Sequence, residues 1–408
     1  MSANLHFATG NVNFDQAQRR LLIDWQDAHH SAFPYIWLRH EQFFPLMGRP
    51  EQRQDSEFCL PEDPASLEIE SISIEPGHLI IDWAHDGSTT RHSLTFLRDN
   101  CLLAKARRQR HPRPRLWNAG QAQAFPWFDA SDFEHRQRRL ELLLQLRDYG
   151  IAMVKNLPDR PGTVESIARY VGPLRNTHFG TLFDIRSLPE DQQGTGANIG
   201  ATSSNAIAPH TDEGWRHGPP GISLMHCLRT NPSGGGVSVF VDGIAAAETL
   251  RGSAPEAFEF LSSVPLTFAA ERNPQERFRA RARVIATDCD GVVRGIRVND
   301  RTQSQPDLDV EQVEPAYRAL RKLYEIILAP ENNFEHLLQP GEMALFDNHR
   351  VLHARRCFDP TAGERWIQQV SVDREEFHNR FRQLAESCDR DELSAWEPDA
   401  GALSQSGR

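Results

Sequence analysis

The sequence predicts a mainly β protein in which helices pack outside a β-sandwich or jelly-roll core, preceded by a small β-rich domain. Four short segments after residue 220, which taken together are rich in β-branched residues, predict strands: ISLMHCL, VSVFVDG, MALFDN and WIQQVSV. Helical patterns occupy residues 245–262 and 310–328. Because strands outnumber helices in this region, a sandwich is favoured over an alternating βαβ sheet.

The first region, residues 21–83, alternates strand-like segments with turn signals. In LEIESISIEPGHLIIDW, bulky and polar residues mostly alternate, as in half-buried strands, and Pro76-Gly77 predicts a hairpin. The basic stretch AKARRQRHPRPRLW follows, and its prolines predict an extended, exposed linker with the domain ending near Pro112. No internal repeat is evident.

The second region opens with an amphipathic helix in RRLELLLQLRDYG, which Gly150 would cap. IAMVKNL predicts a buried strand, and Thr163 is suited to N-cap the short helix VESIARYVG. The polar tail after Cys388 predicts a flexible end. We therefore divide the chain into a β-rich N-terminal domain at 1–115, a larger core domain at 116–388 and a tail at 389–408.

Composition excludes several classes of protein. The 56 acidic residues exceed the 45 basic ones, giving a net charge of -11, which argues against a partner bound through its phosphates, such as nucleic acid. No apolar run reaches the length of a membrane span and the start has no signal-peptide pattern, so we expect a soluble cytoplasmic protein. The six scattered cysteines are typical of reduced thiols.

A metal site is predicted by the segment APHTDEGW. On an extended segment, His210 and Asp212 are two residues apart and point to the same side, so both can bind one ion. A catalytic Fe(II) site of the two-histidine, one-carboxylate type needs a second imidazole, and FDNHRVLHARRCF offers His349 and His353.

The H-x-D pattern by itself is weak, because a surface ion pair would look the same. Arg365 strengthens it, since a guanidinium just ahead of the strand WIQQVSV can bind the distal carboxylate of a dicarboxylic co-substrate. Arg365 alone would prove nothing, because an arginine at the mouth of a barrel is usually part of a rim salt bridge.

Taken together, H-T-D, PPG-I-x-L-x-HC, GG-x-x-S-x-x-VDG, LFDN-x-R-x-LH-x-RR and the later arginine resemble the γ-butyrobetaine and trimethyllysine dioxygenases of the TauD/TfdA-like superfamily. FPYIWLRH and TFLRDNCLLAKAR resemble two segments of that family's N-terminal domain. The resemblance implies a double-stranded β-helix core, Fe(II), 2-oxoglutarate and O₂ as co-substrates, succinate and CO₂ among the products, and a homodimer.

Carried over residue by residue, the resemblance implies that His210, Asp212 and His353 bind the iron. His353 is chosen over His349 because the family writes this stretch as F-D-N-x-R-x-L-H, which puts His349 in the variable slot. Arg365 matches the arginine that binds 2-oxoglutarate. Ser238 matches the hydroxyl residue that assists it, although a serine in a strand is as often merely solvated.

Two departures from the family concern its zinc site and its aromatic cage. WLRHEQFFPLMG stands where zinc-binding cysteines are expected, and His92 alone cannot form a tetrahedral site, so the structural zinc is predicted to be absent. Phe179 and Phe183 match two aromatic residues of the family's trimethylammonium cage. The two other cage positions fall near Thr202 and Ser371, which are not aromatic. Trp215 is either a further cage face or a lid or packing residue.

The residues expected at the acidic end of the substrate also differ, because Asn299 is followed by Asp300, which would repel a carboxylate. The adjacent Arg301 either restores attraction or pairs with Asp300. We expect hydroxylation of a small, γ-butyrobetaine-like ammonium compound. The alternatives are the same chemistry on another small amine, amino acid or phosphonate, including desaturation or cleavage, and a non-catalytic binding protein of the same fold.

Overall fold

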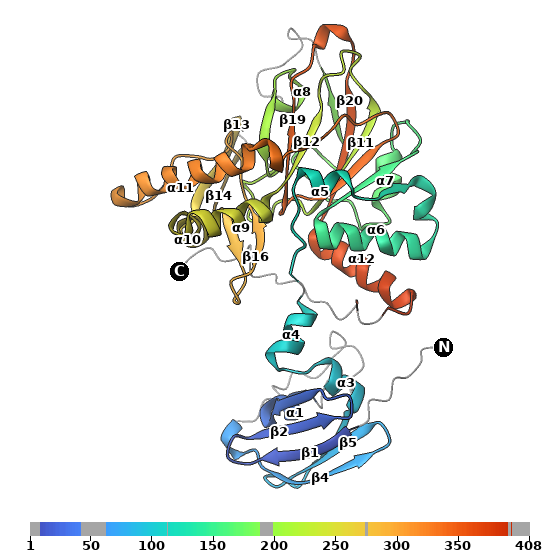
Figure 1. Cartoon of the computed structure of the whole chain (residues 1–408), viewed down its shortest axis with the longest axis vertical. Helices are drawn as coiled ribbons and strands as arrows, with labels where there is room; N and C mark the ends of the chain where they lie inside the picture. Colours follow the sequence, from blue (N-terminus) through green and yellow to red (C-terminus); the bar gives the residue numbers. More distant parts are fainter. Residues whose placement is uncertain are drawn as a thin grey trace. The chain divides into compact units, whose positions relative to one another are not determined.

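The computed structural model describes residues 9–41, 63–111, 113–187, 199–273, 276–390 and 393 (Figure 1). The chain forms two compact units that meet in sequence between Pro112 and Arg113. Within the described ranges, no helix has both the length and the apolar composition needed to cross a membrane. The segment expected to replace the zinc-binding cysteines lies largely outside the described residues, as does most of the predicted tail.

The first unit contains two antiparallel three-stranded sheets, β1-β2-β3 and β4-β5-β6. Their strands are β1 (Thr9–Asp15), β2 (Arg20–Trp25), β3 (His30–Pro34), β4 (Ile69–Glu75), β5 (His78–Trp83) and β6 (Thr89–Ser93). The helices are α1 (Tyr35–Glu41), α3 (Leu94–Asp99) and α4 (Ala104–Arg110). The predicted hairpin is confirmed as β4–β5, with Gly77 in the left-handed region at φ 75°. Part of the predicted extended linker is instead helix α4, whose residues precede the prolines that disfavour helix.

The first unit is a repeat that the sequence analysis missed. Three antiparallel strands followed by a helix occur twice, and β2 and β5 end in the related sequences LLIDW and LIIDW. In each half the tryptophan Nε1 donates a hydrogen bond to a hydroxyl on the next strand: Trp25 to Ser31 at 2.9 Å and Trp83 to Thr90 at 3.0 Å. The pattern escaped notice because the segments between these short matches differ.

Helices α1 and α3 connect the two halves reciprocally. Arg39 of α1 lies over the ring of Trp83 and pairs with Asp86, both in the second half. Arg98 of α3 lies over Trp25, 5.7 Å from its ring centroid, and pairs with Asp27 at 2.6 Å in the first half. Each half therefore completes the environment of the other half's tryptophan.

The second unit is built on two facing sheets, as the predicted jelly roll requires. The six-stranded sheet has the order β7-β8-β18-β11-β20-β9, and all its pairs are antiparallel except β7–β8. The four-stranded sheet has the order β10-β19-β12-β17. The strands of these two sheets are β7 (Trp127–Asp129), β8 (Ile151–Lys155), β9 (Phe183–Arg186), β10 (Ile207–His210), β11 (Ile222–Arg229), β12 (Ser238–Asp242), β17 (Phe334–His336), β18 (Met343–Asp347), β19 (Val351–Arg355) and β20 (Trp366–Val372).

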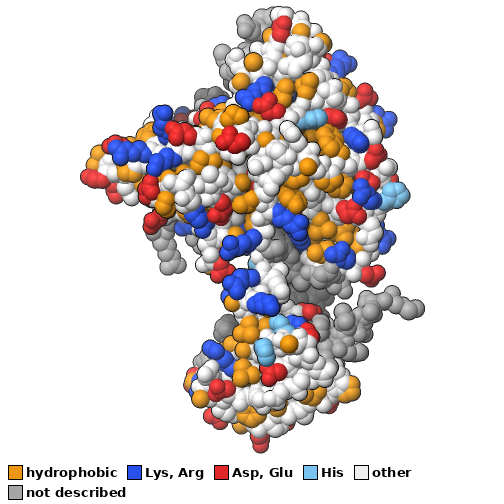
Figure 2. Space-filling model, in the orientation of Figure 1, with side chains coloured by type: hydrophobic (Ala, Val, Ile, Leu, Met, Phe, Trp, Pro, Cys, Tyr) orange, Lys and Arg blue, Asp and Glu red, His pale blue; other side chains and the backbone are white. Residues whose placement is uncertain are grey.

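Helices and two hairpins surround these sheets. The hairpin strands are β13 (Leu266–Asn273), β14 (Glu276–Ala282), β15 (Ile285–Thr287) and β16 (Val293–Ile296). The helices are α5 (Ala119–Gln123), α6 (Arg136–Tyr149), α7 (Thr163–Ala168), α8 (Ile199–Thr202), α9 (Gly243–Ser253), α10 (Pro255–Ser263), α11 (Val310–Leu328) and α12 (Arg374–Ser387). On the face of this unit drawn in Figure 2, basic and acidic side chains are interspersed.

The four strands predicted after residue 220 are confirmed as β11, β12, β18 and β20, and α6 ends, as expected, at a left-handed Gly150 with φ 76°. One detail was wrong. Thr163 is the first residue of α7 rather than its N-cap, because Gly162 adopts the left-handed cap conformation at φ 84°. Three apolar clusters support the unit: one between the two sheets, one between the six-stranded sheet and helices α6 and α12, and one beneath α9, α10 and α11.

Candidate active site

Two histidines and one aspartate converge at one edge of the four-stranded sheet. His210 at the end of β10 lies opposite His353 of β19 in antiparallel register, and their ring centroids are 4.2 Å apart. The carboxylate of Asp212 approaches both Nε2 atoms, at 3.3 Å from His210 and 3.6 Å from His353. One ligand atom from each of the three lies within 4.8 Å of the others. The set can therefore hold one metal ion.

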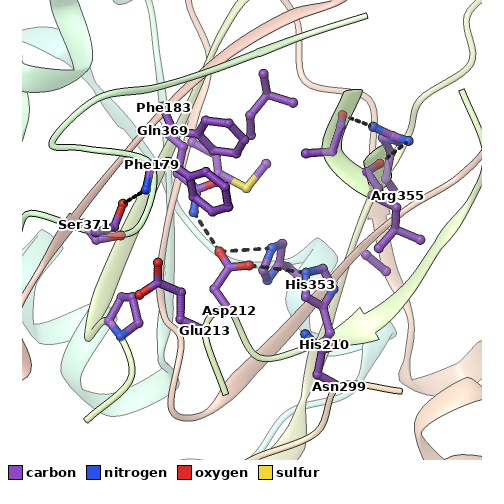
Figure 3. A pocket seen from close by; sticks show the side chains of 18 of the residues that line it. Phe179, Phe183, His210, Asp212, Glu213, Asn299, His353, Arg355, Gln369 and Ser371 are labelled. Atoms are coloured by element: carbon purple, nitrogen blue, oxygen red, sulfur yellow. Dashed lines mark hydrogen bonds and ion pairs between the residues drawn. The ribbon is translucent and has the colours of Figure 1, made fainter. Parts of the chain in front are cut away.

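Hydrogen bonds position Asp212 and His210. The Asn348 side chain accepts a bond from the backbone N–H of Asp212 at 2.8 Å and donates one to its carbonyl at 3.1 Å. Gln369 Nε2 donates to Asp212 Oδ2 at 2.8 Å (Figure 3). His210 Nδ1 lies 3.0 Å from the carbonyl of Ala208, so it carries the proton and leaves the Nε2 lone pair directed at the site.

The environment also sets the protonation of the group. Burial lowers the pKa of His353 to about 3, with Asp212 opposing this shift. For Asp212, burial acts to raise the pKa, but His353, His210 and Gln369 outweigh it and hold the pKa well below its usual range. At neutral pH the site therefore presents a neutral imidazole and an ionised carboxylate, the forms that bind a divalent metal.

His349, the other histidine considered, lies in the turn between β18 and β19. Its Nε2 is 3.0 Å from the carbonyl of Pro219, and burial lowers its pKa to about 4. The structure thus brings His353 to Asp212 and keeps His349 in a separate buried environment.

A cavity of about 450 Å³ opens beside the three side chains (Figure 3). Nine of the ten predicted site residues line it: Phe179, Phe183, His210, Asp212, Trp215, Ser238, Asn299, His353 and Arg365. The tenth, Asp300, is exposed and lies outside the lining. The exposed Arg301 next to it does line the cavity, and Asn299 is buried, with its side chain bonded to the carbonyl of Thr211 at 3.2 Å and to the backbone N–H of Arg301.

Arg365 is a buried cation on the cavity wall. It is only 5% exposed, and within the described ranges its guanidinium forms no ion pair with a carboxylate. Burial lowers its pKa to about 10, with Cys227 opposing. Gly236, at φ 77°, makes room for it, because a Cβ there would lie 2.9 Å from Arg365 Cδ. Ser238 is also buried in the lining, opposite Arg355 in the β12–β19 register.

The aromatic residues do not surround a common centre. Phe179 and Phe183 stack on each other, with centroids 4.2 Å apart and planes inclined by 16°. Each ring therefore covers one face of the other. Trp215 is 4% exposed and packs in the apolar cluster beneath α9–α11 while also forming part of the wall. Of the two non-aromatic cage positions, Ser371 lines the cavity and Thr202 does not.

Three further cavity residues were missed by the sequence analysis. Gln369 could have been found by counting along β20, because it lies two residues before Ser371 and both line the cavity. Glu213 adjoins Asp212 and is 3% exposed. Arg355 donates to four backbone carbonyls between residues 200 and 205, and no sequence pattern marks such a role.

Two imidazoles and one carboxylate, in a jelly-roll cavity with a buried arginine, define the class of mononuclear non-haem iron oxygenases. Comparisons with known proteins identify the family. Residues 111–371 match the family described as "Taurine catabolism dioxygenase TauD, TfdA family". The chain belongs to this family of dioxygenases. The resemblance inferred from the motifs is thus confirmed.

Full-length relatives refine the comparison. The chain is 32% identical to a γ-butyrobetaine dioxygenase from Pseudomonas sp. (strain AK-1), covering 88% of this chain and 92% of that protein. It is 27% identical to the human γ-butyrobetaine dioxygenase, over 89% and 93%. It is 30% identical to the bovine mitochondrial trimethyllysine dioxygenase, over 93% and 89%. A solved asparagine oxygenase in complex with Fe(II), 2S,3S-3-hydroxyasparagine and succinate aligns with a TM-score of 0.47 and 20% identity, over 59% of this chain and 82% of that one.

Proposed function

We propose that this protein is an Fe(II)- and 2-oxoglutarate-dependent dioxygenase that hydroxylates a C–H bond of a small ammonium-bearing substrate. The observation that carries the proposal is the convergence of His210, Asp212 and His353 in one cavity with the buried Arg365, which pairs with no carboxylate among the described residues. A set of metal ligands and a buried arginine in one cavity suit a co-substrate with an acidic end.

Within this proposal, His210, Asp212 and His353 hold Fe(II), and Arg365 binds the far carboxylate of 2-oxoglutarate with help from Ser238. When bound, the iron supplies the O₂ activation that couples decarboxylation of 2-oxoglutarate, to succinate and CO₂, with hydroxylation of the substrate. Gln369 and Asn348 keep Asp212 oriented, and the apolar wall of Phe179, Phe183 and Trp215 restricts water.

The proposed substrate class rests on the residues of the cavity wall that faces Arg355 in Figure 3. Phe179 and Phe183 suit an ammonium group near one end, in keeping with the γ-butyrobetaine named for the dioxygenases that the chain resembles. Arg301 supports an acidic group at the exposed edge of the cavity, and Asn299 shapes the turn that carries it. We further propose that the protein is cytoplasmic, as its sequence predicts, and that it forms a homodimer, as the resemblance implies.

The test is anaerobic addition of Fe(II) and 2-oxoglutarate to the purified protein. We expect a metal-to-ligand charge-transfer absorption, abolished in Asp212→Ala and weakened in Arg365→Gln, because the first variant loses a ligand and the second the partner of the carboxylate. A folded wild-type protein without this absorption would contradict the proposal and favour a non-catalytic binding protein.

A second candidate is the same chemistry on another small amine, amino acid or phosphonate, with desaturation or cleavage as further outcomes. The non-aromatic Ser371 in the lining and the stacking of Phe179 on Phe183 favour it. A screen for substrate-stimulated succinate release with betaines, amino acids and phosphonates separates the candidates.

A further inference from the structure

The wall of the cavity around Phe179 and Phe183 carries more hydrogen-bond acceptors than a trimethylammonium group can use. Phe183 lies opposite Gln369 in the β9–β20 register, and Ser371 follows two residues later on the same side of β20. Glu213 joins the same wall, because its Oε1 accepts a bond from the N–H of His178, the residue before Phe179, at 2.8 Å.

The ring geometry also argues against a cage. A cation bound by several aromatic residues needs ring faces that point at it from different sides. Phe179 and Phe183 instead stack at 4.2 Å and 16°, so each loses one face to the other. In Figure 3 the pair forms a single aromatic layer near Gln369 and Asp212.

The side chains of Gln369 and Glu213 can each accept a further hydrogen bond. Gln369 Nε2 is committed to Asp212 Oδ2 at 2.8 Å, which orients its amide and leaves Oε1 as an acceptor. Each Glu213 oxygen accepts one bond, from His178 or from Arg216 Nε at 2.5 Å, and can accept another. Glu213 also adopts the left-handed region at φ 49°, which is uncommon for a side chain of this size and often marks a functional site.

We propose that this pocket selects an ammonium group that carries N–H bonds, a primary or secondary amine, rather than a trimethylammonium group, with Glu213, Gln369 and Ser371 as its acceptors and one phenylalanine face as its apolar contact. Quaternary ammonium has no hydrogen-bond donor, so binding it here would leave the remaining acceptor capacity of these side chains buried and unused. A protonated amine satisfies them. The inference rests on the proposed function and narrows its substrate class.

The experiment compares two matched pairs that differ only in N-methylation: 4-aminobutyrate with γ-butyrobetaine, and lysine with trimethyllysine. Binding to the anaerobic complex with Fe(II) and 2-oxoglutarate is followed by the change in charge-transfer absorption, and turnover by succinate release. We expect at least one free amine to bind about tenfold or more tightly than its trimethylated partner, the size of effect that hydrogen bonds to a charged group produce.

Glu213→Gln and Ser371→Tyr give opposite expected changes. Glu213→Gln should weaken amine binding about tenfold and leave the trimethylated compounds nearly unaffected. Ser371→Tyr, which adds an aromatic face, should shift preference toward the trimethylated compounds. In both variants the absorption formed with Fe(II) and 2-oxoglutarate alone reports that the site is folded.

The inference is overturned if both trimethylated compounds bind more tightly than their amines, if neither pair binds, or if Glu213→Gln weakens both members of a pair equally. In each of these results the wild-type charge-transfer absorption is present, so the proposed oxygenase chemistry survives. Failure of the proposed function itself is recognised by absence of that absorption before any substrate is added.

Discussion

Individual buried histidines outside the site make stability depend on pH. His226 of β11 is fully buried, and neither ring nitrogen has a hydrogen-bond partner among the described residues. Burial lowers its pKa to about 4 from an ordinary 6.5, although Asp159 opposes the shift. The unfolded chain therefore binds a proton at this position at higher pH than the folded chain does, and stability present above pH 6.5 is lost as pH falls toward 4.

For wild type we expect this histidine alone to remove about 2 kcal/mol of unfolding free energy between pH 7 and pH 5. His226→Leu should remove that part of the dependence, because leucine has nothing to protonate. Urea titrations at the two pH values measure it. Equal losses in wild type and variant would show that His226 does not titrate in this way.

The site residues differ in how far the sequence could predict them. His210, Asp212 and His353 form a compact motif whose chemistry limits the choices, and the structure brings them together. Asp300 was assigned to the substrate pocket, whereas the cavity lining contains the adjacent Arg301, because neighbouring residues in a turn point in different directions. Glu213 was missed because its place depends on bonds to His178 and Arg216.

At the scale of elements, one buried ion pair joins the end of β12 to the turn before β19. Arg350 donates to both carboxylate oxygens of Asp242, at 3.1 and 2.8 Å, and to the carbonyls of Asp148 and Arg115. Asp242 also caps α9 through the N–H of Ile244. Both side chains are almost completely buried. The pair thus fixes the strand that carries His353.

Removing one partner leaves a buried charge unpaired. We expect Arg350→Met to lose about 3–5 kcal/mol of unfolding free energy, and Arg350→Met with Asp242→Asn to recover part of it, because asparagine keeps the cap without the charge. Denaturant titrations of wild type, both single variants and the double variant measure the coupling. A double variant less stable than Arg350→Met would contradict this account.

The sequence predicted helices and strands well where the pattern of apolar residues is strong. It predicted them poorly where the backbone conformation of one residue decides where an element begins or ends. The buried strands β11, β18 and β20 follow from their short apolar runs, and β20 also from its β-branched residues. The first residue of α7 depends on whether Gly162 or Thr163 takes the cap position, and a glycine that can adopt φ 84° takes it. Helix α4 forms before the prolines rather than through them.

On the scale of the whole molecule, the two units have separate apolar cores. The first unit packs around Trp25 and Trp83 in one cluster, and the second around three others. The repeat within the first unit was not predicted, since only short matches such as LIDW and LIIDW survive between its halves.

Because the cores are separate, we expect two thermal transitions in calorimetry. Trp83→Ala, which empties a fully buried position, should lower only the transition of the first unit, by the equivalent of about 3–5 kcal/mol. His226→Leu, which lies in the second unit, should conversely change only the transition of that unit. A single transition that shifts as a whole would show instead that the units unfold together.

The cross-strand position of His210 and His353 has a consequence for folding as well as for chemistry. The two residues are neighbours across β10 and β19 although roughly 140 residues separate them in the chain, so an ion held between them closes a very long loop. The metal would then act as a reversible crosslink that favours the native arrangement in proportion to its affinity. Cellular iron supply would thereby influence the lifetime of the protein as well as its turnover.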